Sequence, residues 1–261
     1  MTRTRQRGFS LVELMVVIAV LTLVMGVVFT TVANVQQRSQ TETQKVDVTQ
    51  SSREFIDQIE RDLRNVGYPN ARMFGTAAGY TSSSAYVAAG IVAASATDIW
   101  FEGDIDGTGT VSSVRYQLVA DANGNCPCTL QRSAVNKLAT TPTTWYSQSL
   151  SFSSELGNVV NSIGALSPWT ITGTAPNGTA NDTLYAGYKT QPVFQYYDSS
   201  NNVISVPNTL SDTTSRDSGH TAAPSVAYIM VTINVLGPIA DQQTGLRPVT
   251  TMRTAVKVNN L

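Results

Sequence analysis

The sequence is poor in the residues from which most catalytic centres are built. It contains one histidine, His220, and two cysteines, Cys126 and Cys128, among 261 residues. One histidine cannot form a multi-histidine zinc site, and two cysteines so close together would need further ligands from elsewhere in the chain. We therefore expect no enzymatic activity and no catalytic cofactor.

Charged residues are also scarce. They make up 13% of the chain, whereas about a quarter is usual in soluble globular domains. The formal net charge of −1 gives no broad electrostatic attraction to nucleic acid, so no nucleic-acid partner is indicated. Serine, threonine, asparagine, glutamine and glycine take the place of charged residues. Such a composition favours a β-rich domain outside the cytoplasm.

The N-terminus combines a basic start with a long apolar run. Arg3, Arg5 and Arg7 precede residues 9–29, which are almost wholly apolar but include one acid, Glu13. As a helix, this run would span about 31 Å, the thickness of a bilayer core, and the arginines would keep its start in the cytoplasm. A carboxylate in lipid costs about 3 kcal/mol and usually marks a function. A secretory signal peptide would have a shorter core, and a plain membrane anchor gives no reason for Glu13.

The segment "GFSLVEL", residues 8–14, resembles the class III signal sequence of type IV prepilins and of type II secretion pseudopilins. The resemblance implies that a prepilin peptidase cuts between Gly8 and Phe9 on the cytoplasmic side of the membrane. It also implies that the new amino group of Phe9 is N-methylated. Glu13 would then face the Phe9 amino group of a neighbouring subunit in a filament.

Electrostatics agrees with this arrangement. The ammonium group at the new N-terminus is the opposite charge that Glu13 lacks within its own apolar segment. A pair formed across two subunits compensates both charges in an apolar filament core, and it fixes the axial register of the two helices.

The helical pattern continues beyond the apolar run. No proline occurs before Pro69, and from Val46 onward apolar residues recur at helical spacing. Gly67 can adopt the left-handed conformation that ends helices, and Pro69 prevents a restart. We therefore predict one helix, or two nearly continuous ones, over residues 9–66. A coiled-coil stalk is not expected, because the apolar stripe is too short for one. The stripe consists of Phe55, Ile56, Ile59, Leu63 and Val66.

The remainder reads as short strands between turns, which predicts a mainly antiparallel sheet, or two, packed on the stripe of 46–66. Together with the resemblance, this predicts an α+β, pilin-like fold. Stretches 76–96 and 140–190 show no clear pattern and would be loops, small helices or an inserted subdomain. The expected parts are a leader peptide (1–8), a transmembrane or filament-core helix (9–29), an amphipathic second half of the helix (30–67) and a β-rich head (68–261). The expected strands are 97–104, 112–121, 128–133, 192–199, 202–206, 225–236 and 247–258.

Two further segments, 60–68 and 254–261, are similar to minor pilins of the PilW type, with the J-type minor pseudopilin of type II secretion as a near neighbour. This resemblance implies a subunit that primes pilus assembly, sits at the filament tip and displays an adhesive or regulatory surface. The implied partners are prepilin peptidase, other minor and major pilins, and the inner-membrane assembly platform. Before assembly the protein would lie in the bacterial inner membrane, and afterwards in a pilus at the cell surface. A membrane-tethered ligand-binding or enzymatic domain with an uncut anchor is the alternative.

One loop of the head is a candidate calcium site. Oxygen-bearing residues at alternate positions fit the first half of a calcium loop, and Gly109 would let the chain turn. Arg115 stands where such a loop needs a bidentate glutamate, so a complete EF-hand is excluded. An ordinary polar turn explains the same residues. The candidate ligands are Asp104, Asp106, Thr108 and, through its carbonyl, Thr110.

The two cysteines are a second candidate feature. Cys126 and Cys128 lie in the part expected outside the cytoplasm, where disulfides form. Because no other cysteine exists, we expect them to form a local disulfide. A metal or redox role would need further ligands near them.

Overall fold

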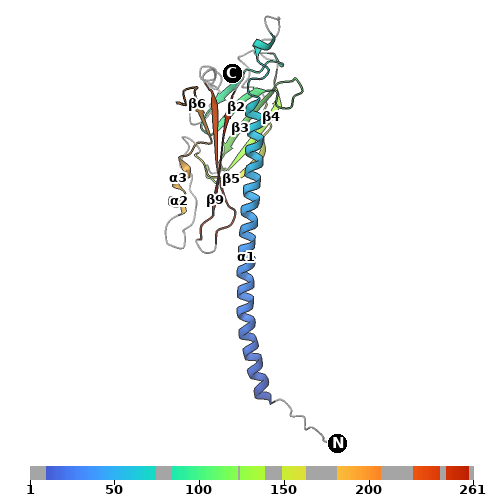
Figure 1. The fold of residues 1–261 in the computed structure, drawn as a ribbon, viewed down its shortest axis with the longest axis vertical. Helices are drawn as coiled ribbons and strands as arrows, with labels where there is room; N and C mark the ends of the chain where they lie inside the picture. The colour runs from blue at the N-terminus through green and yellow to red at the C-terminus, as the bar shows by residue number, and fades with distance from the viewer. Residues whose placement is uncertain are drawn as a thin grey trace. The chain divides into compact units, whose positions relative to one another are not determined.

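The computed structural model describes residues 10–74, 84–122, 124–138, 149–162, 181–206, 226–241 and 245–258 (Figure 1). The chain divides into two compact units, Met1–Gln44 and Lys45–Leu261, and the boundary falls inside the first helix. Gly8 and Phe9, the expected cleavage site, lie outside the described residues, as does His220.

Helix α1 (Leu11–Arg64) confirms the predicted long helix. No proline interrupts this stretch, so the ladder of backbone hydrogen bonds can run without a break. Its last turn tightens, because the amide of Asn65 donates to the carbonyl of Asp62 at 3.1 Å. Gly67 then has a φ of 75°, which is the left-handed conformation that the sequence predicts for the helix end.

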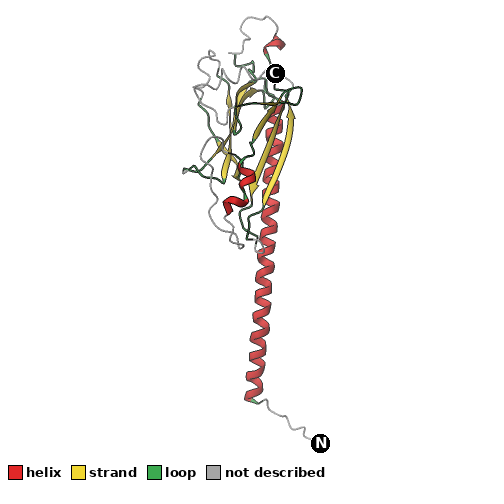
Figure 2. Cartoon of the chain, turned by 90° about the vertical axis from the view of Figure 1, so that its left-hand side faces the viewer, coloured by secondary structure: helices red, strands yellow, loops and turns green. Residues whose placement is uncertain are grey.

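The described strands of the head form one nine-stranded sheet in which neighbouring strands are antiparallel. Figure 2 shows the strands in yellow. The strand order is β1-β2-β3-β4-β5-β8-β6-β7, and β9 pairs with β8. The strands are β1 (Ile91–Ala94), β2 (Asp98–Gly103), β3 (Ser112–Val119), β4 (Cys128–Asn136), β5 (Ser153–Val159), β6 (Phe194–Tyr197), β7 (Val203–Ile204), β8 (Tyr228–Leu236) and β9 (Val249–Lys257). A 3₁₀ turn, η1 (Ala71–Phe74), and two short helices, α2 (Asn181–Leu184) and α3 (Ala186–Lys189), complete the described elements.

The C-terminal part of α1 packs against the sheet, as the sequence predicts. Phe55, Ile59 and Leu63 are buried in one cluster with side chains from the strands. The ring of Phe55 meets the ring of Tyr116 on β3 edge to face, with centroids 5.8 Å apart. The stripe therefore forms the centre of the core, and it belongs wholly to the second unit.

A buried polar cluster fixes α1 on the sheet. The carboxylate of Asp62 accepts a hydrogen bond from the hydroxyl of Tyr116 at 2.6 Å and one from Nε of Arg132 at 2.9 Å. The carboxylate and guanidinium also form a salt bridge, with Nη2 of Arg132 at 2.9 Å. Burial, and then the charge of Asp62, raise the pKa of Tyr116 well above its usual value. Since the three residues come from α1, β3 and β4, they set the rotation of the helix about its axis.

The side chain of Asn161 bonds to the backbone of β8 where no neighbouring strand of the described chain does. Strand β8 pairs with β6 over its first half and with β5 at Val235. Between these partners, Nδ2 of Asn161 donates to the carbonyl of Thr232 at 2.9 Å, and its Oδ1 accepts from the amide of Asn234 at 2.8 Å. Asn161 thus bonds the backbone groups of β8 that would otherwise be buried without partners.

All seven predicted strands are confirmed, with ends that shift by a few residues. Two strands, β1 and β5, form in the stretches that carried no clear pattern. The described strands form one sheet rather than two.

Candidate assembly site

Glu13 lies in the first turn of α1 and is exposed. It is the only charged residue between Arg7 and Arg38. At about 1.5 Å per residue, Arg38 lies roughly 37 Å away along the helix axis, too far for contact. Glu13 has no partner among the described residues, so a cation that pairs with it has to come from elsewhere.

The helix around Glu13 is apolar on every side. Its large apolar side chains from Leu11 to Phe29 are 48% to 75% exposed. The one hydroxyl group in this stretch, that of Thr22, donates to the helix carbonyl of Ala19 at 2.9 Å, so it needs no water. Among the described residues, α1 is the one helix long and apolar enough to cross a membrane, judged by length and composition.

The position of Glu13 at the helix start has an electrostatic consequence. The first turn of a helix carries unpaired amide groups and the positive end of the helix dipole, which favour a carboxylate there. A cationic group placed beside this turn would pair with Glu13 in surroundings that are otherwise apolar, where the attraction between opposite charges is strong. The arrangement suits a joint between chains better than it suits catalysis.

The N-terminus matches a family model, the prokaryotic N-terminal methylation motif, over residues 3–29. The matched residues include Gly8, Phe9 and Glu13. Neither a curated protein nor a solved structure matches the chain.

The matched motif supports a pilin- or pseudopilin-type protein, a class whose members are structural. It implies processing by prepilin peptidase and assembly with other pilins. Together with the apolar start of α1, it fits a membrane-anchored pilin that is later assembled into a surface filament.

The candidate calcium loop forms a tight polar turn between β2 and β3. The carboxylate of Asp104 accepts hydrogen bonds from the amides of Thr108 at 3.1 Å and Gly109 at 2.9 Å. Asp106 accepts from both the hydroxyl and the amide of Thr108, and these bonds lower the pKa of Asp106. Thr110 directly follows the turn. No group of three or more acids, histidines or cysteines that could hold a metal occurs in the described chain, and calcium binding here stays a prediction.

Cys126 and Cys128 are joined by a disulfide at the start of β4. Both side chains are buried in a small cluster with Tyr185 and Leu236. The hydroxyl of Tyr185 also donates to the carbonyl of Arg247 at 2.9 Å. The disulfide therefore belongs to the packing that holds the α2–α3 segment against the sheet.

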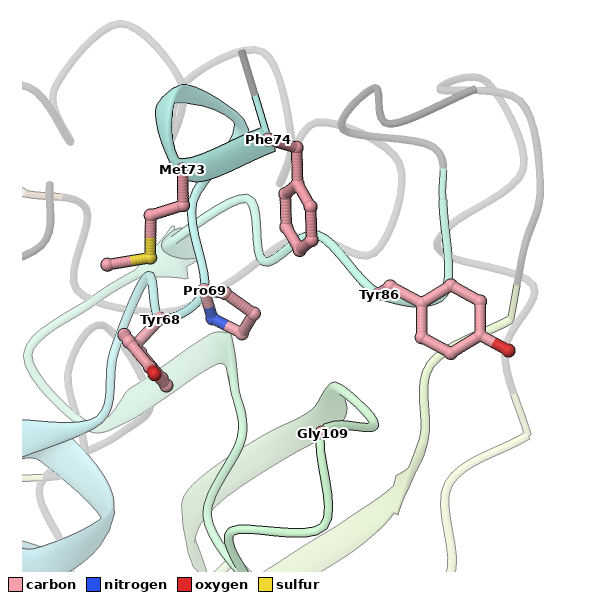
Figure 3. A pocket seen from close by; sticks show the side chains of 6 residues that line it. All are labelled: Tyr68, Pro69, Met73, Phe74, Tyr86 and Gly109. Carbon is pink, nitrogen blue, oxygen red and sulfur yellow. The ribbon is translucent and has the colours of Figure 1, made fainter. Parts of the chain in front are cut away.

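The head also contains an apolar pocket of about 420 Å³ (Figure 3). Three of its side chains, Tyr68, Met73 and Tyr86, are more than two-fifths exposed. Through Gly109 the pocket borders the turn between β2 and β3. Its size and lining suit a small apolar group. The lining residues are Tyr68, Pro69, Met73, Phe74, Tyr86 and Gly109.

Sequence reasoning missed the role of Asp62. It lies among several charged residues of α1, such as Glu60 and Arg64, which pair with each other on the helix surface. No spacing rule marks Asp62 as the buried one, because its partners Tyr116 and Arg132 are distant in sequence. Only the side of the helix that it shares with the apolar stripe could have indicated burial.

Proposed function

We propose that this protein is a minor type IV pilin of the PilW type. It is cut between Gly8 and Phe9, remains in the inner membrane through residues 9–29, and primes assembly of the pilus. It is then incorporated into the filament, at its tip. The head is carried outside the cytoplasm and contacts other pilins.

The observation that carries this proposal is the isolated Glu13 in an exposed apolar helix. Its carboxylate has no partner among the described residues, and the apolar side chains around it have no partner there either. A second subunit would satisfy both needs, because its helix covers the apolar surface and its Phe9 ammonium pairs with Glu13. The methylation motif supports this use of the segment.

A Glu13→Ala substitution tests the joint. Membrane insertion should persist, because the change removes a charge from the apolar run. Filament number should fall more than tenfold, since loss of one partner of a buried pair costs about 3–5 kcal/mol. Electron microscopy and membrane fractionation measure the two effects. Asp47→Ala, at an exposed acid of the same helix, is the matched control, and normal piliation of the Glu13 variant would contradict the proposal.

The mass of the mature chain tests the processing step. In the native host we expect a chain that begins with N-methylated Phe9. In a strain without prepilin peptidase we expect the full leader of residues 1–8. A chain that starts at Met1 in both strains would instead indicate a tethered domain with an uncut anchor.

A minor pseudopilin of type II secretion would use the same joint. A deletion strain separates the two assignments, because loss of pili with normal secretion supports the pilin. Loss of secretion with normal piliation would support the pseudopilin.

A further inference from the structure

Among the described strands, β9 forms the longest edge of the sheet. It pairs with β8 over nine residues without a register shift, and with no other strand in the described chain. The other two edge strands are much shorter, since β1 has four residues and a bulge and β7 has two residues. Long, regular edges invite pairing with another strand, and most proteins cover or shorten them.

The register shows which backbone groups of β9 remain unpaired. The amide of Val258 donates to Ala227 at 3.0 Å, and the carbonyl of Pro248 accepts from Gly237. Because bonding alternates along an antiparallel pair, the even-numbered residues of β9 point their backbone groups at β8. The amides and carbonyls of Thr251, Arg253 and Ala255 therefore point away from the sheet, and in the described chain no partner bonds them.

The side chains along this edge carry charge of one sign. Arg253 and Lys257 are exposed on the outer face, separated by the small side chain of Ala255. The opposite face carries Met252 and Val256, which continue the buried side of the sheet, and between them Thr254, whose hydroxyl donates to the carboxylate of Glu60 on α1 at 3.3 Å. A strand added here would meet Met252, Thr254 and Val256 on one face and two cations on the other.

In two registers, antiparallel pairing of two copies of β9 is disfavoured by these charges. In an antiparallel pair centred on Ala255, Arg253 of one copy would lie opposite Lys257 of the other. Centred on Arg253, the two Arg253 side chains would face each other. Like charges directly opposite on one face are destabilising, so the charges disfavour both of these registers.

We propose that the β9 edge binds an extended segment of a different protein by strand addition. The segment has acidic residues at positions that face Arg253 and Lys257, and apolar residues between them that continue the face of Met252 and Val256. Main-chain hydrogen bonds supply affinity and the alternate side chains supply selectivity, as in other complexes formed by β-augmentation. The proposal does not depend on the function proposed above, because it concerns the head alone.

Two labelled peptides test this edge with the purified full chain in detergent micelles. The first, EVSVEVT, places two glutamates opposite the cations. The second, KVSVKVT, has the same pattern with lysines. Fluorescence anisotropy should show at least tenfold tighter binding of the glutamate peptide. Equal binding of the two peptides, or no binding of either, would overturn the proposal.

Variants identify the edge as the binding site. Reversal of both charges, Arg253→Glu with Lys257→Glu, should weaken the glutamate peptide at least tenfold and make the lysine peptide the better ligand. Arg53→Glu with Arg61→Glu changes the net charge equally at exposed positions of α1 and should leave both affinities unchanged. Ala255→Pro removes an outward amide that β8 does not use, so it should abolish binding while the thermal unfolding midpoint stays within a few degrees. Peptide binding that survives both edge variants would refute strand addition at β9.

Discussion

The two halves of α1 distribute their apolar residues differently. From Leu11 to Phe29 these side chains surround the helix and are 48–75% exposed. From Phe55 to Val66 they form one stripe, and the buried members of that stripe are at most 4% exposed. A helix that is apolar all round needs partners outside its own chain, whereas a stripe needs only one packing surface. The first half is therefore built for lipid or other subunits, and the second for the head.

One acid from each half of α1 shows the same difference, because one has a partner within the chain and the other has none among the described residues. Glu13 has no partner among the described residues, whereas Asp62 is bound by both Tyr116 and Arg132. Both carboxylates lie beside apolar side chains. In the proposed filament the first would pair with an intermolecular cation, whereas the second uses an intramolecular cation to orient the helix.

The largest effect is expected from Asp62→Ala. It leaves the guanidinium of Arg132, whose side chain is only 16% exposed, without its carboxylate, and breaking such a buried pair costs about 3–5 kcal/mol. The free energy of unfolding of the full chain in micelles, followed by tryptophan fluorescence in urea, measures the loss. Asp57→Ala, at an exposed acid of the same helix, should change it by less than about 0.5 kcal/mol. Equal effects of the two variants would refute the docking role of Asp62.

The next largest effect is expected from a leucine in the buried stripe of α1. A leucine from the exposed apolar half of the helix serves as the comparison. Leu63→Ala should lower the free energy of unfolding of the head by about 2–4 kcal/mol, because it leaves a cavity in a fully buried site. Leu21→Ala, in the exposed apolar half, should leave head unfolding unchanged. The same urea titration measures both variants. A comparable loss from Leu21→Ala would show that the first half of the helix also packs within its own chain.

The sequence predicted those strands in which apolar residues alternate or cluster. Strand β9 alternates plainly, and its inward residue Val256 is buried while Arg253 and Lys257 are exposed. Strand β5 has only two buried residues, Leu156 and Val159, among small and polar ones, and its register with β4 is irregular. Strand β1 is short and almost wholly buried, so it has no alternation to detect.

The N-terminal methylation motif could be identified from sequence because its signal is local. Basic residues, a glycine, an apolar run and Glu13 all fall within residues 3–29. The contacts of Asp62 and Asn161 depend on residues that are far away in sequence and meet only in the folded sheet. Polar residues at such positions carry no periodic mark, so neither could be identified before the structure.

A smaller effect is expected from Asn161→Ala. The change leaves the amide of Asn234 and the carbonyl of Thr232 buried without partners, which should destabilise the head by about 2 kcal/mol. Hydrogen exchange should quicken at the amide of Asn234, which Asn161 bonds at present. Asn34→Ala, at an exposed amide in the first half of α1, should alter neither quantity. Unchanged exchange at Asn234 would mean that another group already closes the gap between β5 and β6.

The smallest effect is a fall in the free energy of unfolding at alkaline pH, which arises from the buried hydroxyl of Tyr116. Tyr116 keeps its proton in the folded head, because burial and Asp62 raise its pKa above the unfolded value of about 10. The unfolded state therefore loses this proton first, and folding stability falls as the pH rises above about 10. The loss approaches about 1.4 kcal/mol per pH unit for one proton.

Tyr116→Phe should remove that part of the slope, while it lowers the stability at neutral pH through the lost bond to Asp62. Urea titrations between pH 9 and about pH 11 measure the slope, to which the buried Tyr196 contributes in both chains. Tyr86→Phe, at an exposed ring, is the matched control and should retain the slope of the natural chain. If Tyr116→Phe retained it as well, the hydroxyl of Tyr116 would be ionised alike in both states, and Asp62 could not be its buried acceptor.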